Sequence, residues 1–231
     1  MSLVNVLSIQ VRPGANRRYE ELVADLAKKA AAAKERFRWD AHQTVMGETA
    51  GYHFVSRSET FAGFATRGST PELIERVLGT KQAAQFREQA EEMSTAVRNT
   101  VSLERPDLGY PPDSRDASSL PFAMVTLVRG RPGHQEAIEE LLRKLSEAIP
   151  KVDDPARLVS YQTVIGDLRT LWTVRPMAAL ADLDAQRTPA GLLTEAFGAA
   201  EGGLIWRNAM EGIEEAQRSI TVYRPDLSNP A

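Results

Sequence analysis

The chain has 231 residues, 42% of them hydrophobic and 26% charged, a composition typical of a globular protein with one large domain or two small ones. Its 28 basic and 31 acidic residues are nearly balanced, which excludes a basic nucleic-acid-binding module. Its apolar runs are too short to span a bilayer, and residues 1–4 lack the charged start of a signal peptide. We therefore expect a cytoplasmic protein that binds neither nucleic acid nor membranes.

Cysteine is absent, which excludes disulfides, thiolate catalysis and metal sites built on cysteine. Three histidines, His42, His53 and His134, must carry any imidazole chemistry.

The sequence contains an internal duplication with a constant offset of 119 residues. The matching segments are Arg12-Pro13-Gly14 with Arg131-Pro132-Gly133, Gln43-Thr44-Val45 with Gln162-Thr163-Val164, and Arg105-Pro106-Asp107-Leu108 with Arg224-Pro225-Asp226-Leu227. Only Thr70-Pro71 against Thr188-Pro189 requires a one-residue adjustment. These matches predict two repeats, 1–112 and 122–231, joined by a linker at 113–121 that is rich in turn-forming residues.

The first repeat begins with a predicted strand, Val4–Val11, followed by an amphipathic helix that starts near Tyr19. Residues 39–47 and 52–57 alternate in polarity around glycines, as a hairpin does. Thr70-Pro71 places a capping hydroxyl before a proline, which predicts a helix start.

The pattern after Gly79 predicts a second helical segment through about Asn99, and then a last strand at Val101–Leu103. The second repeat has the same pattern, with its last helix running to about Arg218 and its last strand at Ile220–Tyr223.

The order β-α-β-β-α-β favours the split β-α-β sandwich with strand order 4-1-3-2, so the predicted fold class is α+β with two ferredoxin-like repeats. Both helices cover one sheet face, and the other face needs a partner. If the two repeats supply it to each other, they form a pseudo-twofold barrel with a cavity between the sheets. If each repeat pairs instead with another molecule, the protein is a homo-oligomer.

In its element order, its duplication and its Gln-Thr-Val-x-Gly hairpin, the chain resembles the dimeric α/β barrel superfamily. This superfamily includes antibiotic-biosynthesis-type monooxygenases, NIPSNAP-like proteins and the haem-binding chlorite dismutase family. The last of these supplies an axial histidine from its C-terminal copy. Here that copy holds only His134, in the first turn after Arg131-Pro132-Gly133, so we expect no haem and no other cofactor.

Candidate functional residues are those at which the copies differ in reactive chemistry. His42 aligns with Tyr161 and His53 with Trp172, and Trp39 lies on the same hairpin as the histidines. We expect His42 and His53 to be catalytic and Trp39, Tyr161 and Trp172 to bind a flat aromatic ligand. The alternative is that these side chains only pack. No third ligand has suitable spacing, so no metal site is predicted.

The leading functional hypothesis is that the protein binds a small molecule in a pocket between the two sheets. A narrower form of this hypothesis is that it is a cofactor-independent monooxygenase-like enzyme. The alternative is a non-catalytic barrel module that acts in assembly or protein interaction. Histidine chemistry near neutral pH would make binding or turnover change between about pH 5.5 and 7.5.

Overall fold

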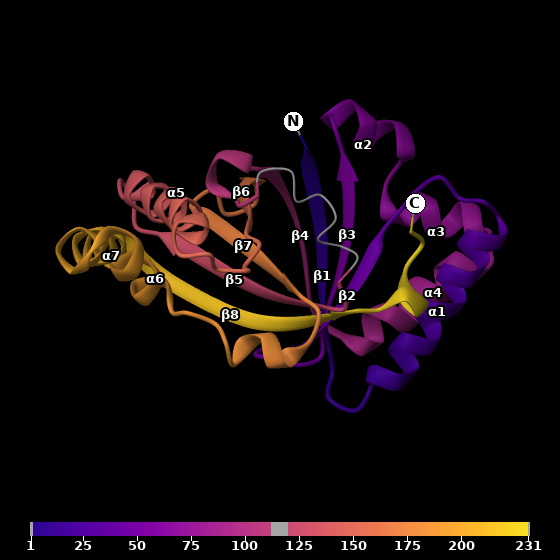
Figure 1. Ribbon diagram of the computed structural model, residues 1–231. Helices are drawn as coiled ribbons and strands as arrows, with labels where there is room; N and C mark the ends of the chain where they lie inside the picture. Colours follow the sequence, from indigo (N-terminus) through magenta and orange to yellow (C-terminus); the bar gives the residue numbers. More distant parts are fainter. Residues whose placement is uncertain (1, 112–119, 231) are drawn as a thin grey trace. The chain divides into compact units, whose positions relative to one another are not determined.

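The computed structural model, which describes residues 2–111 and 120–230, contains the same series of elements twice (Figure 1). The first series is β1 (Leu3–Val11), α1 (Asn16–Ala32), β2 (Asp40–Met46), β3 (Gly51–Ser58), α2 (Phe61–Arg67), α3 (Thr70–Leu78), α4 (Thr80–Met93), β4 (Ser94–Glu104) and η1 (Pro106–Leu108). The second is β5 (Phe122–Gly130), α5 (Gln135–Lys151), β6 (Val159–Ile165), β7 (Thr170–Met177), η3 (Leu180–Leu183), α6 (Pro189–Phe197), α7 (Ala199–Gly212), β8 (Ile213–Tyr223) and η4 (Pro225–Leu227). Every element of the first series has its counterpart 119 residues later, except that the short 3-10 helix η3 replaces the helix α2.

The predicted strand order is confirmed. Hydrogen bonding orders the eight strands β1-β3-β2-β8-β5-β7-β6-β4 in a closed barrel. Within each repeat this is the order 4-1-3-2 expected of a ferredoxin-like unit. The fold class is therefore α+β with two ferredoxin-like repeats. Of the predicted linker 113–121, residues 113–119 lie outside the described part of the chain.

The chain forms two compact units that are offset from the repeats. Unit 1 comprises Met1–Ser102 and Thr221–Ala231, and unit 2 comprises Leu103–Ile220. The residues that end each repeat thus pack in the unit built mainly by the other repeat. The repeat boundaries at 112 and 122 remain a prediction.

The last strand of each repeat is longer than predicted, and this part of the sequence prediction was wrong. β4 begins at Ser94 and β8 at Ile213, where helices were expected to continue through about Asn99 and Arg218. Residues 94–100 are mostly exposed and polar, and such a composition resembles that of a solvated helix. Pairing along the sheet outweighs this local preference. The helix α2 was not predicted.

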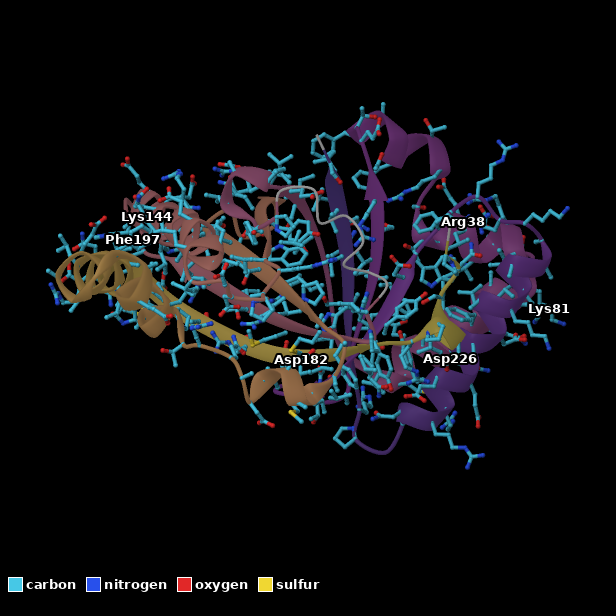
Figure 2. The ribbon with its side chains drawn as sticks, viewed as in Figure 1. Arg38, Lys81, Lys144, Asp182, Phe197 and Asp226 are labelled. Carbon is cyan, nitrogen blue, oxygen red and sulfur yellow. The ribbon has the colours of Figure 1, made fainter. Side chains whose placement is uncertain are left out.

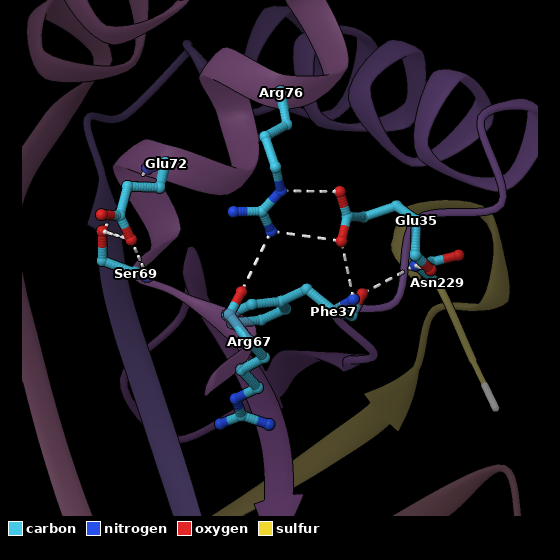
Figure 3. Close-up of polar contacts among 7 residues, drawn as sticks. All are labelled: Glu35, Phe37, Arg67, Ser69, Glu72, Arg76 and Asn229. Carbon is cyan, nitrogen blue, oxygen red and sulfur yellow. Dashed lines mark hydrogen bonds and ion pairs between the residues drawn. The ribbon is translucent and has the colours of Figure 1, made fainter. Parts of the chain in front are cut away.

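Capping residues explain where the second group of helices begins. Ser69, not Thr70, caps α3, and Glu72 accepts a bond from the Ser69 backbone N–H at 2.6 Å (Figure 3). Thr188 caps α6 by accepting from the Gly191 N–H at 3.1 Å. Because Ser69 and Thr188 are themselves 119 residues apart, the one-residue adjustment is unnecessary.

Each unit has its own core between helices and sheet. In unit 1, α1, α3 and α4 lie on one side of the β1-β3-β2 sheet (Figure 1). In unit 2, α6 and α7 pack more extensively on α5 than α3 and α4 do on α1. Figure 2 shows Lys144 of α5 next to Phe197 of α6, where its ammonium lies 5.3 Å from the ring centroid.

Candidate functional site

Unit 1 contains a cavity of about 500 Å³ between its sheet and its helices. Strand β1 lines it with Asn5, Leu7 and Ile9, and β3 lines it with Phe54 and Ser56. The helices contribute an apolar wall made of Tyr19, Val23, Leu26, Leu73, Ile74 and Phe86. Phe37 and Trp39 complete the lining next to β2. This volume and this aromatic lining are typical of sites for small organic ligands.

The aromatic residues of the cavity are specific to the first repeat. At the positions of Tyr19, Phe37, Trp39 and Phe54, the second repeat has Ile138, Ala156, Leu158 and Thr173. The indole N–H of Trp39 donates to the Leu227 carbonyl at 2.8 Å, and its ring meets that of Phe37 edge-on at 6.3 Å. The orientation of Trp39 is therefore fixed by the segment of the chain that follows β8.

The opening of the cavity lies at the junction of α4 and β4. The exposed members of the lining are Arg87, Glu91, Thr95, Ala96 and Val97. At the other end of β1, Asn5 is the cross-strand partner of Ser56. The cavity thus runs from a charged opening, past an apolar middle, to a second polar end.

The predicted catalytic histidines are brought together. His42 and His53 are direct cross-strand partners on β2 and β3. The hydroxyls of Ser8 and Thr44 lie 2.9 Å from Nδ1 and 3.0 Å from Nε2 of His53, so both ring nitrogens are engaged. The His42 ring lies 5.6 Å from that of Tyr223.

Burial controls the charge of both histidines. Desolvation lowers the pKa of His42 to about 4, although Asp40 opposes the shift, and desolvation also lowers the pKa of His53. The His42 ring is therefore neutral at pH 7, and the shift of the His53 pKa favours the neutral ring as well. For His42 the titration lies below the window predicted from an ordinary histidine, because the sequence did not show that this half-buried ring would be desolvated.

Trp39 lies on the opposite face of the sheet from the two histidines. Side chains alternate along a strand, so Trp39 and Phe54 face the helices while His42 and His53 face away from them. The structure therefore separates Trp39 from the histidine pair, although all three belong to one hairpin.

Tyr161 and Trp172 form the corresponding cross-strand pair in unit 2. Their rings stack with centroids 4.0 Å apart and planes tilted by only 16°. Tyr161 is buried. A ligand-binding role for this stacked pair remains a proposal.

The repeated Arg-Pro-Asp-Leu and Gln-Thr-Val motifs meet in space. In unit 1, Arg224 donates to Gln43 at 2.6 Å and pairs with Glu20 and Asp226 (Figure 2 labels Asp226). In unit 2, Arg105 makes the same contacts, which are to Gln162, Glu139 and Asp107. Each arginine thus fastens the end of one repeat to the hairpin and helix of the other, which accounts for the presence of both motifs in both copies.

The residues of unit 2 do not fit a haem held by a histidine. Its one histidine, His134, is an exposed residue that precedes the first turn of α5. Within residues 2–111 and 120–230, no group of three or more His, Asp or Glu side chains is placed to hold a metal ion. No helix in the same ranges is long and apolar enough to cross a membrane.

Comparison with known proteins identifies the fold. No protein-family model and no curated protein matches the chain. Among solved structures, an anthrone oxidase-like protein is 12% identical, with a TM-score of 0.57, covering 100% of this chain and 94% of the other. A candidate monooxygenase from Fusobacterium nucleatum subsp. nucleatum is 9% identical, with a TM-score of 0.56, covering 96% and 92%. The chlorite dismutase of Candidatus Nitrospira defluvii, solved with imidazole, is 12% identical, with a TM-score of 0.54, covering 97% and 92%.

These similarities extend over both repeats, and at such low identities they establish the fold alone. The protein has the fold of the dimeric α/β barrel superfamily.

Proposed function

We propose that this protein binds a small, largely apolar aromatic molecule in the cavity of unit 1. The observation that carries the proposal is a cavity of about 500 Å³ whose aromatic lining has no counterpart in the second repeat. Residues that served only the fold would be expected in both copies. Five aromatic positions that differ together around one cavity, Phe86 with its counterpart Ile205 among them, point to a ligand.

The cavity is better suited to binding than to proton transfer. Its ionisable side chains are Arg87 and Glu91 at the opening and Tyr19 in the wall. Burial, with a smaller contribution from Tyr52, raises the pKa of Tyr19 well above its ordinary value, so this phenol stays protonated. We therefore assign the cavity to ligand binding.

The test uses the neutral probe 2-(hydroxymethyl)anthraquinone and isothermal titration calorimetry. Ala90→Phe places a ring inside the cavity, because Ala90 is part of the lining. Ala84→Phe makes the same change on the exposed side of α4. We expect the wild type and Ala84→Phe to bind alike and Ala90→Phe to bind about tenfold more weakly or worse. Equal binding by both variants would place the probe elsewhere and refute the assignment.

A second candidate is monooxygenase-type catalysis, with His42 and His53 as acid–base groups and Tyr161 and Trp172 as ligand-binding residues. Its support is the neutral histidine pair, together with a fold shared with an anthrone oxidase-like protein. Oxygen consumption with a hydroxyanthracene substrate that is lost in His53→Ala would select this candidate. If the wild type neither binds the probe nor consumes oxygen, the non-catalytic module becomes the better description.

A further inference from the structure

Arg67, at the end of α2, is a half-buried cation without a carboxylate partner in the described part of the chain. Its guanidinium donates to the Ser56 hydroxyl at 2.9 Å and to the Arg57 carbonyl at 3.1 Å. The same group lies 4.7 Å from the ring centroid of Phe37 and 4.2 Å from that of Phe64. Desolvation lowers the pKa of Arg67, and no opposing carboxylate contributes. All of its contacts are therefore neutral.

Glu35, which Arg76 links to the backbone of Arg67, is already paired. Glu35 pairs with Arg76, whose Nε and Nη2 each lie 3.1 Å from a Glu35 oxygen. Figure 3 shows the Arg67 guanidinium directed away from this pair, with only its backbone carbonyl accepting from Arg76.

In unit 2, the arginines at the position that corresponds to Glu35 are paired with a carboxylate. Asp154 is the counterpart of Glu35, since the N–H groups of both residues donate to the carbonyl five positions earlier. The Asp154 side chain is only 3% exposed and pairs with Arg175 at 3.8 Å and Arg187 at 3.2 Å. Two arginines thus share one buried carboxylate.

In unit 1 the strand position of Arg175 is held by Ser56, and the guanidinium that reaches it comes from Arg67. Unit 1 therefore keeps a cation at this place, whereas its counterpart of the Asp154 carboxylate, Glu35, is paired with Arg76 instead. A desolvated charge without a counter-ion is costly, and it is commonly retained where a ligand supplies the missing charge.

Arg67 is not itself a lining residue of the cavity, but it contacts the lining at the polar inner end. Both Ser56 and Phe37, which it contacts, belong to the cavity lining, and Asn5 faces Ser56 across the sheet. A ligand that fills the apolar middle of the cavity would bring its far end to these three polar side chains.

We infer that the ligand is an organic acid, with an aromatic or otherwise apolar body in the cavity and one carboxylate or phenolate group paired with Arg67. This inference rests on the proposed function and adds the chemical class of the ligand. Asn5 and Ser56 supply neutral hydrogen bonds to the same acid group. The guanidinium supplies the charge and two parallel N–H donors.

The experiment compares anthraquinone-2-carboxylate with the neutral 2-(hydroxymethyl)anthraquinone at pH 7. In the wild type the carboxylate should bind more tightly. In Arg67→Gln, its affinity should fall about tenfold or more, the loss expected for a charge-assisted hydrogen bond, while the neutral probe changes less than about twofold. Arg18→Gln removes an exposed cation of α1 that lies outside the cavity lining and is the matched control, with a change below about threefold for either probe.

The outcomes separate this inference from the proposed function. If neither probe binds the wild type, the proposed function itself fails. If the neutral probe binds but the carboxylate is not preferred, or Arg67→Gln weakens both probes equally, the cavity stands and the organic-acid inference is overturned. An effect of Arg18→Gln as large as that of Arg67→Gln would likewise overturn it. Arg67→Lys, which keeps the charge, should retain part of the preference if folding is intact.

Discussion

His42 illustrates how its surroundings determine what a side chain can do. It lies on the sheet face that the helices leave uncovered, near Tyr223 and directly opposite His53. The charged groups that act on it are Asp40, which favours protonation, and Arg57 and His53, which oppose it. Burial, together with Arg57 and His53, outweighs the effect of Asp40, and the ring remains neutral until the solution is distinctly acidic.

This predicts a specific loss of stability in acid. The unfolded chain takes up the His42 proton near pH 6.5, whereas the folded protein does so only near pH 4. Stability from this group is therefore complete above about pH 6.5 and declines as the pH falls through 4, by about 3 kcal/mol in total. Urea unfolding between pH 7 and 4 should show this decline, which His42→Phe should reduce and His134→Gln, at an exposed site, should leave unchanged.

The sequence alignment of the two copies can be compared with the structure on the hairpins. His42 and Tyr161, which the alignment pairs, occupy equivalent cross-strand positions, while their functional roles stay a prediction. The sequence could not reveal Arg67, because its importance comes from Glu35 being paired with Arg76 rather than from a motif. Trp39 was predicted as a ligand-binding residue, but Phe54 was missed, since aromatic side chains that line a cavity and those that fill a core have the same sequence pattern.

At the scale of elements, one small residue helps to explain why the helices of the two units pack differently. Gly202 of α7 lies so close to α6 that a Cβ there would be 2.6 Å from the backbone carbonyl carbon and oxygen of Leu193. The counterpart in α4 is Ala83. The close approach of α7 and α6 accompanies the denser packing of unit 2, whereas unit 1 retains its cavity.

Gly202→Ala should therefore destabilise the protein although alanine favours helix formation. We expect a loss of about 1–3 kcal/mol in the free energy of unfolding, because the clash is with backbone that cannot move cheaply. Gly203→Ala is the neighbouring control. Its Cβ would meet only the end of the Arg207 side chain at 3.4 Å, so a gain of about 0.5–1 kcal/mol is expected. Guanidinium-induced unfolding of both variants measures the difference, and a stabilised Gly202→Ala would show that α6 and α7 can separate.

The order of elements was predictable because turns and caps recur with the same offset in both copies. The lengths of the elements were harder to predict. The start of β4 at Ser94 depends on the neighbouring strand, and no local signal separates residues 94–100 from the helix that precedes them.

At the scale of the whole molecule, the end of each repeat belongs to the core of the other unit. Leu227 is fully buried in the main cluster of unit 1, and Leu108 is fully buried in unit 2. Asn229 is 1% exposed and bonds to the carbonyl of Phe37 at 2.8 Å. The segment that follows β8 is thus an interior part of unit 1.

Leu227→Ala and Leu108→Ala should each lower the free energy of unfolding by about 2–5 kcal/mol, as expected for cavities left in a packed core. Leu204, which is 52% exposed on α7, provides the surface comparison, where a change within about 0.5 kcal/mol is expected. Thermal and urea unfolding would test all three. A Leu227→Ala variant as stable as Leu204→Ala would mean that this segment only rests on the surface.

The exchange of terminal segments also constrains how the protein is made. A ribosome releases the first repeat long before residues 224–229, yet Trp39 has no partner for its indole N–H until the Leu227 carbonyl arrives. The core of unit 1 therefore remains incomplete while the second half of the chain is synthesised. During that interval its unfinished core is exposed to chaperones, proteases and other nascent chains.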